Sequence, residues 1–184
     1  MVPGPVAEII GSTFDRFREM YPFRKDRIAN DRLHMSLASM HAGHRLPDRV
    51  IDTSLRIGDA IQFAGFDIAL DRALSFHNRS ARNPFVIAAS TSASCAVNQL
   101  ARQIRQSAAQ MTGCRVNQGG TITPHVSVVW DRLLVPEHAI EPIKLPGREV
   151  ALVHSYIGQS RYEILRRWPL PGKEPERPRQ AQLF

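Results

Sequence analysis

The chain has 184 residues, of which 43% are hydrophobic, and these values are typical of one globular domain or of two small lobes that share a core. The longest apolar run, residues 85–89, is too short to cross a bilayer, and the first residues lack the pattern of a secretory signal, so we expect a cytoplasmic protein. The net charge of +7 favours a polyanionic partner, because Lys and Arg neutralise phosphates, but it does not identify one.

The first third of the chain predicts a helix, a strand and a second helix. Apolar residues recur at the three-and-four spacing of an amphipathic helix over residues 6–21, and Pro22 ends this helix. Residues 32–38 alternate in the manner of a half-buried β-strand. Pro47 opens a second helix, whose less regular apolar face runs to Gly65.

The middle of the chain predicts two strands and the clearest helix. Residues 66–71 alternate between apolar and polar and predict a half-exposed strand, whereas residues 85–89 are apolar throughout and predict a buried strand. The Ser and Thr residues at positions 90–94 supply an N-cap for a helix that ends at Gly113.

The last third of the chain predicts three strands and a tail. Residues 123–130 read as a strand, residues 136–146 as a loop, and residues 149–154 and 161–168 as two closing strands. Residues 171–184 combine prolines with alternating charge, which predicts a flexible C-terminal tail.

Strands and helices thus alternate twice along the chain. This order predicts an α+β fold of two similar lobes, each an antiparallel sheet with helices on its outer face. The two sheets are expected to face each other across a central cleft. We expect residues 1–170 to form this single bilobal domain.

Two short motifs, one in each half, repeat the same chemical groups: His34-Met35-Ser36-Leu37 and His125-Val126-Ser127-Val128. Alternate residues of a β-strand share a face, so His34 and Ser36 point to one side, and so do His125 and Ser127. One such motif is weak evidence. The occurrence of two, both in strand-like segments, indicates an active site in which these four residues are catalytic.

Paired imidazoles and hydroxyls suit the cleavage of a phosphodiester. The ordinary pKa of imidazole, about 6.5, allows one His to act as a general base and another as a general acid near neutral pH. Each Ser hydroxyl can donate to a non-bridging phosphate oxygen as negative charge builds up there. The sequence contains no carboxylate cluster and no H-E-x-x-H motif that would hold a metal, so we expect neither a metal nor another cofactor.

The paired motifs resemble those of the two-histidine phosphoesterase superfamily and, more narrowly, of the bacterial RNA 2',3'-cyclic phosphodiesterases, also called 2'-5' RNA ligases. The likeness runs from Arg32 to Leu170 and includes the closing stretch, residues 154–170. It implies hydrolysis of a 2',3'-cyclic phosphate, on an RNA end or a nucleotide, to a 2'-phosphate, with 2'-5' ligation of suitable RNA ends as a second activity. It also implies that His125 activates the water and that His34 protonates the leaving oxygen. We expect a monomer without a membrane partner.

Three further residues are candidates for substrate contact. Arg161 and Ser155 border the expected cleft at the closing strands, and Arg82 lies in the loop that precedes the strand at residues 85–89. All three are polar or basic groups of the kind that binds phosphate.

The sequence departs from the family at its beginning and after the second motif. Family members usually open with a hydrophobic strand, which residues 2–5 do not suit. An Arg is common in the family where Trp130 stands. Arg132 is a candidate to replace it, but strand alternation puts Arg132 on the face of Trp130.

Two other functions remain open at this point. One is a phosphodiesterase that acts on a small cyclic nucleotide such as an ADP-ribose cyclic phosphate, which presents the same phosphate as an RNA end. The other is a non-catalytic RNA-binding module, which the intact His and Ser pairs disfavour.

Overall fold

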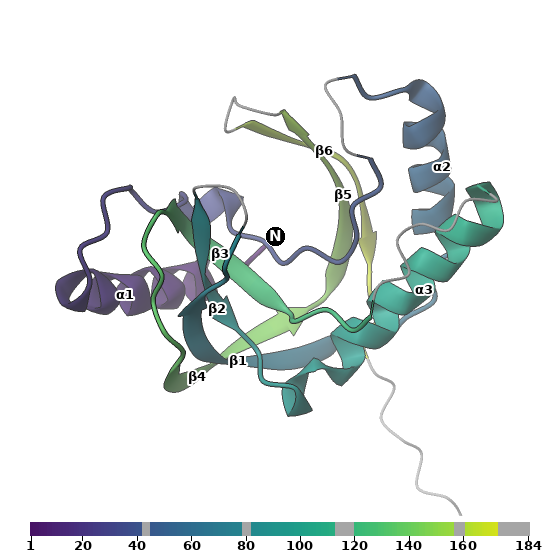
Figure 1. Ribbon diagram of the computed structural model, residues 1–184. Helices are drawn as coiled ribbons and strands as arrows, with labels where there is room; N and C mark the ends of the chain where they lie inside the picture. Colours follow the sequence, from purple (N-terminus) through teal and green to yellow (C-terminus); the bar gives the residue numbers. More distant parts are fainter. Residues whose placement is uncertain (42–44, 79–81, 113–119, 157–160, 173–184) are drawn as a thin grey trace, which may run out of the picture.

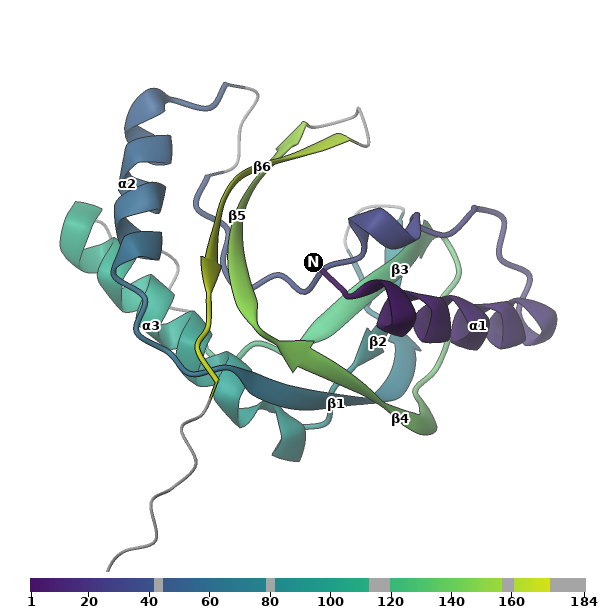
Figure 2. The same cartoon turned by 180° about the vertical axis from the view of Figure 1, so that it is seen from behind.

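The computed structural model describes residues 1–41, 45–78, 82–112, 120–156 and 161–172. Its elements are, in chain order, α1 (Gly4–Met20), α2 (Asp48–Asp59), β1 (Phe66–Ser75), β2 (Asn83–Ala88), α3 (Cys95–Thr112), β3 (His125–Asp131), β4 (His138–Gly147), β5 (Glu149–Tyr156) and β6 (Arg161–Pro169). One antiparallel sheet has the order β3-β2-β1-β4, and β5 and β6 form a second. Helix α1 lies beside the first sheet, whereas α2 and α3 lie outside the second (Figures 1 and 2). This arrangement is the predicted α+β fold.

Helix α1 covers one face of the four-stranded sheet and confirms the predicted amphipathic helix. Its Ile10, Phe14 and Phe17 are buried. The rings of Phe14 and Phe17 lie 5.9 and 5.1 Å from the ring of Phe85 in β2. Each such apolar side chain stabilises the fold by roughly 1.5–3 kcal/mol when fully buried, so this contact fixes α1 against β2.

Helices α2 and α3 share a smaller core. Ile57 of α2 and Leu100 and Ile104 of α3 are buried in one cluster. Helix α2 ends at Asp59 and not at the predicted Gly65, while α3 confirms the third predicted helix. The predicted stop at Gly113 and the predicted tail beyond residue 172 fall outside the described residues.

The start of α3 differs from the prediction that a Ser or Thr at positions 90–94 caps the helix. The helix follows a short 3-10 turn, Ser92–Ser94, and Thr91, which precedes this turn, makes no side-chain capping bond. The Ser94 hydroxyl instead donates to the Ser90 carbonyl at 2.6 Å. Local side-chain bonding of this kind competes with capping.

The prediction of a loop at residues 136–146 is wrong, because most of this segment forms β4. It pairs with β1 in a register that sets Ile68 opposite Leu145 and Leu70 opposite Ile143. All four side chains are buried. Strand β4 lies at the edge of its sheet, where a strand can contain prolines such as Pro142 without losing pairing to a second neighbour.

The first histidine segment is not the predicted strand. Residues 32–38 make a single antiparallel bridge, between Met35 and Val126 of β3. The Val2 main-chain N–H donates to the Leu33 carbonyl at 2.9 Å. The first residues of the chain therefore contact this segment through this bond, without forming a strand.

Strand β3 contains a bulge that reverses which residues face each side. Ser127 is the partner of Val86 and Val129 is the partner of Phe85, so Val128 is an extra residue without a partner in the register. An extra residue shifts the alternation by one position. Accordingly, Val128 and Val129 are both buried, whereas 43% of Trp130 is exposed. Trp130 thus lies on the face of His125 and Ser127, and the predicted alternation is wrong from the bulge onward.

Asp131, the last residue of β3, is 5% exposed and holds the chain that follows α1. Its carboxylate accepts main-chain N–H groups of Arg24 at 2.7 Å, Lys25 at 3.0 Å, Arg132 at 2.6 Å and Leu133 at 3.3 Å. Burial acts to raise the pKa of this carboxyl, but the four bonds to the charged form hold it below the usual 3.8.

We expect Asp131→Asn to lower the free energy of unfolding by about 1.5–3 kcal/mol, because hydrogen bonds to a charged acceptor are lost. Denaturant unfolding measures the loss. Since the folded pKa is lowered, the contribution is present above pH 3.8 and disappears as the pH falls through the folded value. Asp26→Asn is the control, because the Asp26 side chain is 97% exposed in its 3.7 Å ion pair with Arg18. Equal losses in the two variants would contradict the role of Asp131.

Candidate active site

The two motif histidines make the same main-chain contact. His34 Nδ1 lies 2.8 Å from the Arg32 carbonyl oxygen, and His125 Nδ1 lies 2.8 Å from the Thr123 carbonyl oxygen. A carbonyl oxygen only accepts, so each Nδ1 carries the hydrogen. In the neutral ring the other nitrogen, Nε2, then holds the free electron pair. Both imidazoles are thereby fixed in the tautomer that a base at Nε2 requires.

The bridge between Met35 and Val126 aligns the two motifs. In an antiparallel pair centred on these residues, His34 lies opposite Ser127 and Ser36 lies opposite His125. Opposite residues have Cβ atoms about 4.5–5.5 Å apart, and diagonal residues are about 7–8 Å apart. The two histidines are a diagonal pair, so a phosphate-sized group can contact both.

Each imidazole also meets an aromatic ring. The Phe76 ring lies 4.9 Å from the His125 ring and the Tyr162 ring lies 5.3 Å from the His34 ring, both close to perpendicular. Burial lowers the pKa of His125 below 6.5; the bond to Thr123 opposes this effect and the charge of His34 adds to it. His125 is consequently neutral, and able to accept a proton, at neutral pH.

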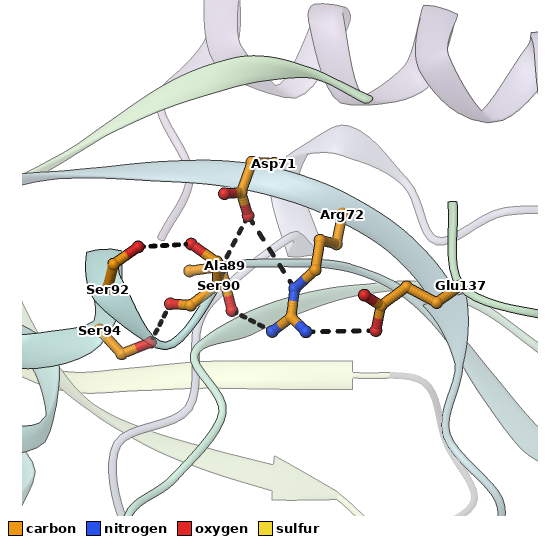
Figure 3. A network of polar contacts seen from close by, with 7 residues as sticks. All are labelled: Asp71, Arg72, Ala89, Ser90, Ser92, Ser94 and Glu137. Carbon is orange, nitrogen blue, oxygen red and sulfur yellow. Dashed lines mark hydrogen bonds and ion pairs between the residues drawn. The ribbon is translucent and has the colours of Figure 1, made fainter. Parts of the chain in front are cut away.

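A polar network holds the strand end that neighbours His125 (Figure 3). Arg72 donates to the Ala89 carbonyl at 2.6 Å and pairs with Glu137 at 3.2 Å. The carboxylate of Asp71 accepts the Ser90 main-chain N–H at 2.8 Å. Since the Ala89 N–H in turn donates to the Pro124 carbonyl at 2.9 Å, the network positions the backbone just before His125.

A cavity of about 570 Å³ opens beside His34. Its polar lining includes His34, Ser36, His154, Ser155 and Tyr162. Apolar side chains of residues 35–40, α2, α3, β5 and β6 line much of the rest. The volume is in the usual range for small-molecule sites. His125 and Ser127 are not part of its lining, so of the two motif histidines His34 alone borders this cavity.

The three predicted substrate residues lie in different places. Ser155 lines the cavity, paired with Tyr162 across β5 and β6. Arg161 begins β6, is exposed, and stacks its guanidinium on the Tyr156 ring at 4.7 Å. Arg82 is exposed just before β2. Only Ser155 is brought together with a motif histidine.

The sequence does not identify the aromatic neighbours of the histidines. Tyr162 has the spacing of a core residue, and Phe76 follows a strand whose partners are unknown from sequence. His154 lines the cavity but belongs to no motif. Only their spatial proximity identifies them.

The described part of the chain contains no group of three or more His, Cys, Asp or Glu side chains placed to hold a metal ion. None of the helices in the same described ranges is long and apolar enough to span a bilayer.

Several solved structures are similar to the chain over most of its length. TT0787 of Thermus thermophilus has a TM-score of 0.70 at 20% identity, covering 90% of this chain and 93% of TT0787. E. coli LigT, in complex with ATP, has a TM-score of 0.66 at 22% identity and 93% coverage of both chains. A structure described as a phosphoesterase has a TM-score of 0.65 at 24% identity, covering 92% of this chain and 94% of that one.

No protein-family model and no curated protein sequence matches the chain. At these identities, the structural likeness establishes the fold. The chain therefore has the fold of TT0787 and LigT.

Proposed function

We propose that the protein is a phosphodiesterase that opens 2',3'-cyclic phosphates to 2'-phosphates without a metal ion. The observation that carries this proposal is the matched pair of histidines, each with Nδ1 bonded to the carbonyl two residues earlier. An arrangement of this kind presents two Nε2 atoms to one phosphorus. The Ser36 and Ser127 hydroxyls complete a set of four groups on two adjacent segments.

The proposed reaction uses one imidazole as base and the other as acid. His125 Nε2 takes a proton from a water molecule as its oxygen attacks phosphorus. The bond between phosphorus and the 3'-oxygen breaks, and His34 Nε2 gives that oxygen a proton. The product has a 2'-phosphate and a free 3'-hydroxyl. Ser36 and Ser127 donate to the non-bridging oxygens, where charge increases in the transition state.

Structural neighbours support a nucleotide or RNA end as the substrate class. LigT is described in complexes with ATP and with 3'-AMP, so that protein accommodates nucleotides. A 2'-5' ligation is the same displacement with the 5'-hydroxyl of a second RNA end in place of water: its oxygen bonds to phosphorus and the bond to the 3'-oxygen breaks. We propose it as a secondary activity. A phosphodiesterase of small cyclic nucleotides is the alternative, because a 570 Å³ cavity beside His34 can hold a mononucleotide.

We expect hydrolysis of cytidine 2',3'-cyclic phosphate to proceed at the same rate in excess chelator, because the proposed steps use only imidazoles and hydroxyls. Phosphorus NMR of the product distinguishes a 2'-phosphate from a 3'-phosphate. Activity that is lost in chelator and returns with an added divalent ion would contradict the mechanism. A 3'-phosphate product would reverse the choice of leaving oxygen.

A further inference from the structure

The two motif histidines carry the same groups and make the same main-chain bond, so neither feature decides which of them is the base. Their surroundings differ. His34 borders the cavity of about 570 Å³, whereas His125 is not part of its lining. The ring against His34 belongs to Tyr162, which has a hydroxyl, and the ring against His125 belongs to Phe76, which is hydrocarbon only. The difference between the two imidazoles therefore includes the side chain of Phe76.

The backbone that presents the Phe76 ring is tied on two sides. Ser75, the last residue of β1, donates its main-chain N–H to the Val135 carbonyl at 2.9 Å. Its hydroxyl accepts the Val135 N–H at 3.1 Å. The main-chain N–H of Phe76 donates to the Pro84 carbonyl at 3.0 Å. The ring consequently extends from a fixed point beside β2.

The contact between Phe76 and His125 adds a second restraint on the imidazole. The ring centroids are 4.9 Å apart and the planes meet at 79°, which is one of the arrangements that aromatic pairs prefer. The torsion that turns an imidazole about its Cβ–Cγ bond has broad minima. The bond from Nδ1 to the Thr123 carbonyl restrains this torsion at one ring atom, and the Phe76 ring restricts the imidazole from another side.

The same contact places hydrocarbon where water would otherwise meet the imidazole. Burial disfavours the charged form of a histidine, and it is the largest cause that lowers the pKa of His125. The charge of His34 lowers this pKa further, while the bond to Thr123 opposes both effects. A base must be neutral before it can accept a proton, so an apolar neighbour favours this role.

We propose that Phe76 is a positioning residue that orients the imidazole of His125 and shields it from water, and thereby gives the role of base to the second motif. It acts through His125 and not on the phosphate. This inference rests on the proposed function, since it explains how two nearly identical motifs take different roles in one reaction.

The first test is the pH dependence of cytidine 2',3'-cyclic phosphate hydrolysis. Phe76→Ala should lower kcat at neutral pH about tenfold or more, because a misplaced base attacks water poorly. The acid limb should also move to higher pH, since water now reaches the imidazole and its pKa rises toward 6.5. Phe76→Tyr retains the ring and should restore most of the turnover. An acid limb that does not move in Phe76→Ala would overturn the inference.

Phe63→Ala is the matched control. It removes a partly exposed ring whose perpendicular neighbour, Phe66, lies 6.0 Å away. Phe63 does not line the cavity, so both the turnover and the acid limb should stay unchanged. Equal effects in Phe63→Ala and Phe76→Ala would mean that loss of any such ring disturbs the protein, and would overturn the role of Phe76.

A substrate with a nitrophenolate leaving group shows which histidine Phe76 serves. This leaving group needs no proton, but the attacking water still needs a base. The loss in Phe76→Ala should therefore persist with this substrate. Recovery to the wild-type rate would place Phe76 with the acid and overturn the inference.

Nitrogen-15 NMR of the His125 imidazole, assigned by its absence in His125→Ala, tests the inference without turnover. In the wild-type protein the ring should carry its hydrogen at Nδ1 and titrate below pH 6.5. In Phe76→Ala it should mix the two tautomers and titrate at a higher pH. An unchanged signal overturns the inference even where turnover falls. If the wild-type protein hydrolyses no cyclic phosphate, the proposed function is wrong, and this comparison alone decides whether Phe76 positions His125.

Discussion

Replacement of His34 or His125 by Ala is expected to reduce turnover of a 2',3'-cyclic phosphate at least about a hundredfold, the usual contribution of a positioned acid or base. The carbonyls of Arg32 and Thr123 fix the tautomers of these imidazoles, so each variant loses a group that is already oriented for proton transfer. Single-turnover kinetics of each variant measure the chemical step directly.

The double variant is expected to lose far less than the product of the two single losses, because the base and the acid serve one step. A loss equal to that product would mean that the histidines act in independent steps. His138→Ala is a matched control. This imidazole bonds the Tyr21 hydroxyl at 2.7 Å and contacts the Phe17 ring on the α1 side of the sheet. The turnover of His138→Ala should stay close to that of the wild-type protein. Thermal unfolding of all variants distinguishes loss of catalysis from loss of the fold.

The fold was predictable wherever a local pattern fully determined the environment of a segment. Helix α1 is an example, since its apolar spacing matches the face that it buries, and strand β3 is another up to its bulge at Val128. Residues 32–38 show the same alternation as β3 but make only one bridge, because a strand also needs a partner along its length and a sequence pattern does not provide one. The prediction of a loop at residues 136–146 was wrong because a local signal was outweighed by the position of the segment in the sheet. The prolines of β4 indicate a loop locally, whereas its edge position tolerates them.

The candidate site was predictable in its reactive groups and not in its surroundings. The two motifs identify His34 and His125, and their pairing in space follows from the Met35 bridge. No pattern in the sequence indicates the bulge at Val128, because the apolar run that contains it is compatible both with regular strand pairing and with one residue that lacks a partner. The face of Trp130 depends on that single residue. Long-range geometry of this kind requires the register of the neighbouring strand.

The burial of His125 leads to a prediction on pH. Its lowered pKa means that the neutral, basic form persists below pH 6.5. If His125 is the base, the acid limb of the rate profile for a cyclic phosphate lies below pH 6.5 and the complete profile is bell-shaped. The two limbs belong to the interacting pair, since the charge of His34 affects His125. An acid limb above pH 6.5 would contradict this assignment.

A substrate whose leaving group needs no proton separates the two roles. With a nitrophenolate leaving group, His34→Ala should recover to within about tenfold of the wild-type rate, because the acid is no longer required, whereas His125→Ala should keep a loss of at least about a hundredfold. The alkaline limb of the wild-type profile should also vanish with this substrate, since only deprotonation of the acid produces it. Recovery of His125→Ala in place of His34→Ala would reverse the assignment. Equal recovery of both would mean that neither imidazole has a fixed role, although the same main-chain bond holds each of them.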